Sequence, residues 1–264
     1  MIHGEGSPYL YKIMVYPIKS LPPVELPEAR ITRYGTLEWD RLYALVDERG
    51  LYVNGKRERR IHLVRARYDL LRGLVYLSAC CGEEQEYSLD KEPEEVSRWF
   101  TRFLGYSVRL VKRPEGYPDD EANRGPTVIS TGTLAEVGSW FGWDLLQARL
   151  RFRANLEIGG VEPFWEDQLY AGKGKAVVFR VGEVLMEGRN ISKRCVVPSR
   201  DPFTAAGTIG FQKEFVRRRK PMLRGKYPES DHGYRLSINT VVRPGQEGKV
   251  LKIGDPVEVL GLKR

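Results

Sequence analysis

The chain has 264 residues, of which 41% are hydrophobic and 30% are charged, a composition typical of a globular protein that excludes a largely disordered one. Its formal net charge of +8 favours an anionic ligand or partner. The sequence shows neither an apolar run of about 18 residues nor the apolar core of a signal peptide, so we expect a soluble cytoplasmic protein.

The first hundred residues consist mostly of short segments in which hydrophobic and polar residues alternate, a pattern that predicts β-strands. Turn sequences at 47–50 and around Gly73 should each close a hairpin between neighbouring strands. The strands that we expect lie at 10–15, 29–35, 41–47, 51–55, 64–71 and 74–79. This part is therefore predicted to be a β-meander or barrel.

The period of the hydrophobic residues changes at 92–105, where they recur at helical spacing. Pro93 stands at the start of this segment, acidic residues follow it, and Gly105 marks the end, so we predict a helix. A strand at 106–112 and a polar loop at 113–126 with three prolines come next. We interpret the loop either as a domain boundary or as a functional loop folded over a site.

Beyond the loop, Ser130 or Thr131 can cap a short helix, and strand patterns return at 151–158, 175–188, 234–242 and 248–261. The elements do not alternate regularly between strand and helix. The predicted fold class is therefore mainly β (α+β), with a few helices.

The densest basic run, from Arg217 to Lys220, follows the apolar pattern Phe211, Phe215 and Val216 of an amphipathic helix. Two interpretations stay open. The run can be a solvated helix end favoured by the helix dipole, or a docking patch for an acidic partner.

Common nucleotide and peptidase motifs are missing from the sequence, which has no P-loop, no GxGxxG, no HExxH and no GxSxG nucleophile elbow. This lowers the case for ATP-dependent, dinucleotide-dependent and zinc peptidase chemistry. The histidines His3, His62 and His232 are scattered, and we interpret them as structural or solvent-facing.

The three cysteines, two of them adjacent, form neither a disulfide framework nor a zinc-binding pair. Cys80 and Cys81 end a strand-like run and are interpreted as structural. Cys195 follows Lys193 and Arg194, and such cations favour the thiolate, which attacks electrophiles or binds soft metals. From the local sequence alone, an inert buried thiol is an equally good interpretation of Cys195.

Cationic and polar side chains at the ends of predicted strands are the parts of a phosphate site. Lys19 and Ser20 follow the first strand, Arg41 stands at the mouth of another, and Arg153 and Asn155 share one face of a strand at two-residue spacing. Arginine binds phosphate bidentately and lysine acts as a point charge. Taken singly, each of these residues is more simply interpreted as solvated.

Six motifs, in order, resemble those of the two-domain MOSC proteins, which include the mitochondrial amidoxime-reducing component and the C-terminal part of molybdenum cofactor sulfurase. The motifs are YPIKS at 16–20, DR at 40–41, FRAN at 152–155, ED at 166–167, RC at 194–195 followed by DP at 201–202, and IGDPVEVL at 253–260. The resemblance implies a MOSC N-terminal β-barrel domain at 1–115 and a MOSC domain at 116–264, with the first strand near 8–20 packing against the second domain.

The resemblance also implies a pterin-based molybdenum cofactor, held between the domains, with Cys195 as the thiolate ligand of the metal and the catalytic residue. Glu166 and Asp167 would order a loop beside Arg153. The cofactor-binding residues that it implies are Lys19, Ser20, Arg41, Arg153, Asn155 and Arg194.

The activity implied by the resemblance is a molybdenum cofactor-dependent reduction of N-hydroxylated compounds. Electrons would come from an external donor such as a ferredoxin, a flavodoxin or a cytochrome b5-like protein, and neither a membrane nor a nucleic acid is an expected partner. The membrane anchor of the eukaryotic members is not found in the chain, so a soluble prokaryotic form is expected.

The alternative is a sulfur carrier or molybdenum cofactor carrier that uses Cys195 as its persulfide or ligand site. The sequence departs from the family pattern DPDTG after the cysteine, where it has DPFTAAG. The longer turn after Asp201 lies where we expect the substrate pocket to be shaped.

Overall fold

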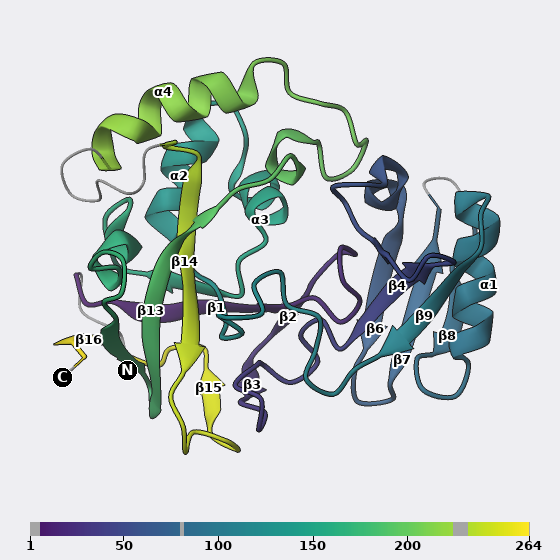
Figure 1. Ribbon diagram of the computed structural model, residues 1–264, viewed down its shortest axis with the longest axis horizontal. Helices are drawn as coiled ribbons and strands as arrows, with labels where there is room; N and C mark the ends of the chain where they lie inside the picture. The colour runs from purple at the N-terminus through teal and green to yellow at the C-terminus, as the bar shows by residue number, and fades with distance from the viewer. Residues whose placement is uncertain (1–5, 80–81, 224–231, 264) are drawn as a thin grey trace.

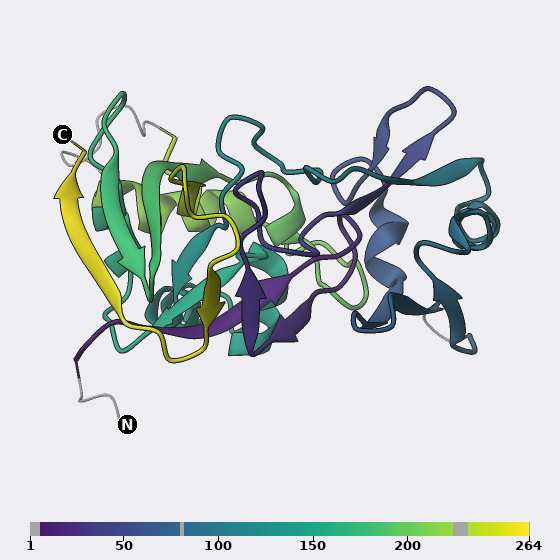
Figure 2. The same cartoon turned by 90° about the horizontal axis from the view of Figure 1, so that it is seen from below.

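The computed structural model describes residues 6–79, 82–223 and 232–263 as an elongated molecule with two β-rich parts (Figure 1). Cys80 and Cys81, interpreted above as structural, lie outside the described residues. Figure 2 shows from a second side that the two parts lie end to end along the long axis. The predicted fold class, mainly β with a few helices, is confirmed.

The larger part is built on an eight-stranded sheet in the order β16-β12-β13-β14-β10-β11-β1-β2, antiparallel except for the parallel pair β10 and β11. Its strands are β1 (Tyr9–Val15), β2 (Val24–Leu26), β10 (Val128–Ser130), β11 (Leu156–Gly159), β12 (Val177–Val181), β13 (Val184–Lys193), β14 (Arg235–Val242) and β16 (Val257–Leu262). A separate antiparallel pair joins β3 (Glu28–Arg30) to β15 (Val250–Lys252). The first strand of the chain thus pairs with β11, far along the sequence.

The smaller part holds two three-stranded antiparallel sheets and a helix that packs against them. The two hairpins predicted at 47–50 and around Gly73 are confirmed, since β4 pairs with β5 and β6 with β7. The elements of this part are β4 (Tyr43–Asp47), β5 (Tyr52–Val53), β9 (Val108–Lys112), β6 (Arg65–Asp69), β7 (Leu74–Ser78), β8 (Gln85–Ser88) and α1 (Pro93–Leu104).

The helix α1 begins and ends where the sequence predicted. Pro93 stands in its first turn, where a missing N–H costs no hydrogen bond, and Gly105 ends it in the left-handed conformation with φ 72°. Val96, Phe100 and Leu104 are buried at the helical spacing of four residues and face the sheets.

Three further α-helices cover the larger part, α2 (Thr131–Ser139), α3 (Leu145–Phe152) and α4 (Phe211–Leu223), together with the short 3-10 helices η2 (Trp165–Leu169) and η3 (Val197–Ser199). The 3-10 helix η1 (Arg59–Leu63) belongs to the smaller part, where its Ile61 packs in the core. The predicted cap of α2 is confirmed, because the Ser130 hydroxyl accepts a hydrogen bond from Thr133 N at 3.1 Å.

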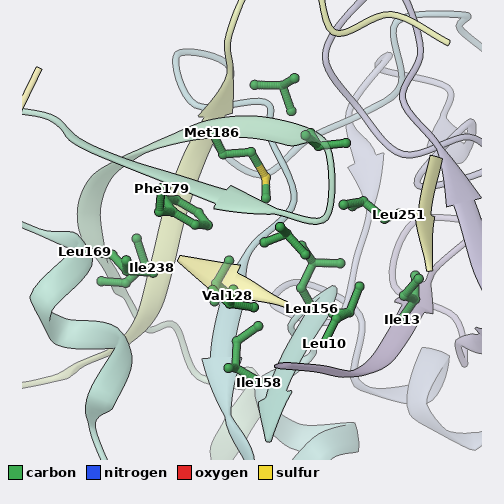
Figure 3. Packing of buried hydrophobic residues seen from close by; sticks show 14 of the residues in the cluster. Leu10, Ile13, Val128, Leu156, Ile158, Leu169, Phe179, Met186, Ile238 and Leu251 are labelled. Carbon is green, nitrogen blue, oxygen red and sulfur yellow. The ribbon is translucent and has the colours of Figure 1, made fainter. Parts of the chain in front are cut away.

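A buried cluster of aliphatic residues fills the larger part beside the sheet (Figure 3). In β1 a shift of register between Leu10 and Lys12 adds one residue to the strand, so Leu10 and Ile13 both point inward although strict alternation would separate them. Phe179 and Met186, from neighbouring strands, pack into the same cluster.

Two predicted strands were wrong in part. The segment 29–35 is a strand only to Arg30 and then turns, with Gly35 N donating to Thr32 O at 2.9 Å. The segment 151–158 begins as the end of α3, because the Asp144 side chain caps that helix and its buried residues recur at helical spacing. Arg153 is the left-handed residue that ends α3, with φ 53°, so Arg153 and Asn155 do not share a strand face.

The basic run on α4 also differs from both interpretations of it. Arg219 is fully buried, and its Nη2 donates to both carboxylate oxygens of Asp167 at 2.6 and 2.7 Å. Arg217 and Arg218 both pair with Glu214 on the same helix. The prediction of a continuous basic surface from 217 to 220 is therefore wrong, because Arg219, one of its four cations, is buried in the core.

Candidate functional site

A cavity of about 560 Å³ lies where the polar loop 113–126 meets residues from both parts of the molecule. The loop contributes residues 116–121 and 123–125 to its lining. Of the two interpretations offered for this loop, the functional one is favoured, because the loop forms one wall of a cavity. The opposite walls come from the segments around residues 41, 54–56, 153 and 190–197.

Cys195 lies on the wall of this cavity, two residues after β13 ends and two residues before η3. Its side chain is partly buried, and its backbone oxygen accepts a hydrogen bond from the Tyr234 hydroxyl at 2.8 Å. Cys195 also lines a groove on its other side, formed with Gln212 and Lys213 of α4. The thiol therefore stands between two hollows of the surface.

Three arginines reach the same cavity from distant parts of the chain. Arg41 precedes β4, Arg153 ends α3, and Arg194 follows β13. Burial lowers the pKa of Arg153 and of Arg194. Burial also acts to lower the pKa of Arg41, but Asp40, Asp119 and Tyr16 together outweigh it and raise that pKa. These guanidinium groups are held partly out of water, so an anion that binds between them finds cations only weakly solvated.

Tyr16, from the YPIKS segment, positions two of these arginines. The guanidinium carbons of Arg41 and Arg153 lie 5.2 and 4.2 Å from the centre of its ring. The Tyr16 hydroxyl donates to Ala154 O at 3.3 Å, and burial raises its pKa to about 12. The phenol is therefore neutral, and both guanidinium groups lie over its ring.

Backbone strain gathers around this cavity. Among the described residues, seven that are not glycine have positive φ, and three of them, Ser20, Arg41 and Arg153, line the cavity. A fourth, Ser237, accepts a hydrogen bond through its hydroxyl oxygen from Arg194 Nη1 at 3.3 Å. Such conformations cost free energy and cluster at functional sites, so their gathering here supports a functional cavity.

Lys19 does not line the cavity. Its side chain is buried, and its Nζ donates to Tyr117 O at 2.9 Å and to Asp119 Oδ1 at 2.8 Å. Burial lowers the pKa of Lys19, and Asp119 partly offsets this effect. The cation predicted to hold a phosphate is thus paired with a carboxylate of the cavity loop.

Ser20 and Asn155 were predicted together with these cations. Ser20 lines the cavity, and its hydroxyl accepts from Gly55 N at 3.3 Å. Asn155 lies behind the wall, where its Oδ1 accepts from Arg41 Nη1 at 3.3 Å and its Nδ2 donates to Met14 O at 3.0 Å. Asn155 therefore contacts the cavity wall through Arg41 and through Thr127, whose N and hydroxyl both donate to Asn155 Oδ1 at 3.1 Å.

The expected place of Glu166 and Asp167 beside Arg153 was wrong. Glu166 is buried in η2 and accepts from the Thr133 hydroxyl at 2.9 Å, while Asp167 binds Arg219. Burial and the neighbouring Asp167 raise the pKa of Glu166 to about 7. Both acids stabilise the contact between η2 and the helices instead.

Sequence reasoning missed His62 and Asp119 as residues of the cavity wall. His62 lies in η1, and its buried Nε2 has no hydrogen-bond partner among the described residues. Burial and the charge of Arg153 lower its pKa to about 4, so the imidazole is neutral at pH 7. No motif marks either residue, since each reaches the cavity only through packing of the two parts.

The described residues hold no group of three or more His, Cys, Asp and Glu side chains arranged for a metal ion. Among the same residues, no helix is long and apolar enough to cross a membrane.

Comparison with known proteins relates the chain to molybdenum cofactor proteins. Curated relatives named molybdenum cofactor sulfurase are 28% identical over 60% of this chain in Danio rerio, 40% over 28% in Aspergillus terreus and 38% over 34% in Aspergillus fumigatus. These matches cover 25%, 9% and 10% of the relatives, so the chain spans a quarter of their length or less.

Among solved structures, a chain described as an hypothetical protein aligns with 99% of this chain and 70% of its own length, at 11% identity and a TM-score of 0.40, which is too low to support a conclusion. The model of the MOSC N-terminal beta barrel domain matches residues 7–92. That segment includes β1 to β8, Lys19, Ser20, Arg41 and His62. Residues 7–92 are therefore identified as a MOSC N-terminal beta barrel domain, and parts of the chain are similar to molybdenum cofactor sulfurases.

Proposed function

We propose that the chain binds the molybdenum cofactor in the cavity beside Cys195 and reduces N-hydroxylated compounds with electrons from a separate redox protein. The observation that carries this proposal is the convergence of Arg41, Arg153, Arg194 and the Cys195 thiol on one cavity. These residues come from three distant segments, and their meeting suits an anionic ligand that carries a soft metal.

The charge of the cavity fits a phosphate-bearing pterin. Among the described residues that line it, seven are Arg or Lys and four are Asp or Glu, so its wall carries a net positive charge. Arg194 Nε and His62 Nε2 are buried without a hydrogen-bond partner among the described residues. Buried polar atoms of this kind are normally satisfied, so these two support a ligand that supplies the missing partners.

In the proposed complex, the guanidinium groups of Arg41, Arg153 and Arg194 bind the phosphate and the polar edge of the pterin, and Tyr16 and Asn155 orient the first two. The Cys195 thiolate would be the ligand that the protein supplies to the molybdenum. When bound, the cofactor supplies a metal that takes up two electrons and passes them to the substrate.

The overall reaction breaks the N–O bond of an N-hydroxylated compound and forms an N–H bond. Two electrons come from the external donor, which is oxidised, and two protons come from solvent, so that the oxygen leaves as water. A ferredoxin, a flavodoxin or a cytochrome b5-like protein is the class of donor that we propose.

The test is the cofactor content of protein made in a host that synthesises the cofactor. Molybdenum is measured by metal analysis and pterin by fluorescence, for the wild type, Cys195→Ser and Arg153→Gln. Arg180→Gln is the matched control, because Arg180 is exposed on β12 and pairs with Glu258 far from the cavity lining.

We expect pterin and molybdenum in the wild type and the control, retained pterin with an altered metal signal in Cys195→Ser, and loss of both in Arg153→Gln. Turnover of hydroxylamine with a chemical reductant then tests the activity. Wild-type protein without molybdenum would overturn the proposal.

The second candidate function is a sulfur carrier, supported by the name of the relatives, molybdenum cofactor sulfurase, and by the groove that Cys195 lines with Gln212 and Lys213. In that case the Cys195 thiolate attacks the outer sulfur of a donor persulfide, takes up that sulfur, and leaves the donor as a thiol. Mass spectrometry after incubation with a cysteine desulfurase and cysteine should then show one added sulfur atom, absent in Cys195→Ser.

A further inference from the structure

A smaller cavity of about 200 Å³ adjoins the larger one, and Ser20, His62 and Arg153 line both. The smaller cavity differs in character from its neighbour. Its other walls include apolar side chains from four segments of the chain, among them Pro22, Ile61, Val64, Leu150, Pro202 and Phe203. We call it the Phe203 cavity.

Phe203 belongs to the lengthened turn after Asp201, and hydrogen bonds hold this turn in place. Asp201 Oδ1 accepts from Phe203 N at 2.9 Å and from Thr204 N at 2.8 Å. From the smaller part of the molecule, Arg65 Nη2 donates to Phe203 O at 2.8 Å and Arg59 Nε donates to Ala205 O at 2.7 Å. The turn is therefore a fixed wall.

The ring of Phe203 is not part of the protein core. Its side chain is 38% exposed, although most of the other aromatic rings are buried or half-buried. The Arg65 guanidinium lies 5.5 Å from the centre of the ring. An aromatic ring held in place at a cavity wall, and not used in the core, is a contact surface for another apolar group.

The volume limits what the Phe203 cavity can hold. Ligand pockets usually measure about 300 to 1,000 Å³, whereas an apolar cavity of about 150 Å³ accepts benzene. A cavity of about 200 Å³ therefore holds one ring and not a whole ligand. Because it shares a wall with the cationic cavity, the rest of the same ligand can lie beyond His62 and Arg153.

We propose that the Phe203 cavity binds an aromatic ring of the substrate, whose N-hydroxylated group lies in the larger cavity. This assignment rests on the proposed function for the identity of the polar group, but the binding of a ring can be tested without turnover. Phe203 is then a residue that determines specificity and takes no part in the chemical step.

The variant Phe203→Asp places a charge in the cavity wall, and Phe203→Leu keeps the wall apolar. Ile209→Asp is the matched control, because it makes the same kind of change on the same segment at a side chain that is fully exposed. In holoenzyme, Phe203→Asp should raise the KM for benzamidoxime about tenfold, the lower end of what a hydrophobic pocket discriminates, and leave its kcat unchanged. The KM for hydroxylamine, which has no ring, should not change in any variant.

A second readout does not depend on turnover. Saturation-transfer NMR with benzamide should show ring contact with the wild type, Phe203→Leu and Ile209→Asp, and none with Phe203→Asp. Acetamide, which has no ring, is the control ligand, and its signal should not differ among these proteins. The two readouts separate the cavity assignment from the proposed function. If the benzamide signal is lost only in Phe203→Asp but the wild type reduces no N-hydroxylated compound, the proposed function is wrong and the cavity assignment holds.

Two results overturn the assignment itself. One is equal binding of benzamide to the wild type and to Phe203→Asp. The other is loss of pterin fluorescence from Phe203→Asp but not from Ile209→Asp, which would give the cavity to the cofactor.

Discussion

The electrostatics of the cavity predict that Asp119→Asn binds anions more tightly than the wild type. Asp119 lines the cavity, and its Oδ1 lies 2.8 Å from the buried Nζ of Lys19, so the carboxylate neutralises a cation that would otherwise attract an anionic ligand in the cavity. The protein around Asp119 desolvates the carboxylate and raises its pKa, but Lys19 and Arg41 outweigh this and hold the pKa well below its usual range. Asp119 is therefore charged at neutral pH.

The size of the effect follows from the exposure of the pair. Two unit charges about 4 Å apart interact by about 1 kcal/mol in water and about 4 kcal/mol at an effective dielectric constant of about 20. The Asp119 side chain is 62% exposed, so solvent screens the pair and the lower part of this range applies. Removing the competing charge should strengthen anion binding by about 1 to 2 kcal/mol, or about 5- to 30-fold.

The assay is calorimetric titration of cofactor-free protein with pyrophosphate, at low and at raised ionic strength. Glu121→Gln is the matched control, because Glu121 also lines the cavity but pairs with Arg113 and Arg124 instead of Lys19. The gain in Asp119→Asn should shrink as salt is added.

Unchanged or weaker binding by Asp119→Asn would refute this reasoning. So would an equal gain in Glu121→Gln, because the effect would then come from the general charge of the cavity and not from competition for Lys19.

Three further predictions concern the stability of the fold. Arg219→Leu removes the cation that both oxygens of Asp167 bind in a buried pair, and should cost about 3 to 5 kcal/mol in urea denaturation. A second change of Asp167 to Asn should restore part of that loss, and no recovery would contradict the charge argument. His62 has a folded pKa of about 4 against 6.5 in the unfolded chain, so the unfolded state binds more protons and stability falls as pH drops from 6.5 to about 4. For this partly buried ring the free energy of unfolding should fall by about 1 to 2 kcal/mol over that pH range. The fall should be missing from His62→Gln, and a pH profile of stability in that variant equal to that of the wild type would contradict the role of His62. Gly188→Ala would make a Cβ clash with Leu169 O and should cost about 3 kcal/mol. A melting temperature equal to that of the wild type would contradict this clash.

Local features of the fold could be predicted because neighbouring residues determine them. Pro93 and Gly105 mark the ends of α1, and Ser130 caps α2, through the hydrogen bonds that a helix end requires. The hairpin around Gly73 needs a residue that tolerates positive φ, and Gly73 has φ 67° there. In each case the responsible residue lies within a few positions of the structure that it sets.

Prediction failed where a contact between distant segments decides the outcome. The sequence pattern presents Arg219 as one of four solvated cations. Its burial depends on an ion pair with Asp167 in η2 and on the ring of Phe164, the residue before η2. Arg153 fits the alternation of a strand in isolation, but the cap of α3 by Asp144 extends the helix up to it. Neither partner can be recognised from the spacing of the residues alone.

The sequence by itself determined which residue types could form a site, since a free thiol, three arginines and a motif order like that of the MOSC proteins are all read without coordinates. Only the tertiary structure decided which of them meet. It placed Arg41, Arg153 and Cys195 around one cavity, turned Lys19 away to pair with a loop carboxylate, and brought in His62. The physical reason is that the cavity lies between segments more than a hundred residues apart, whose approach is set by the packing of two hydrophobic cores and not by any local pattern.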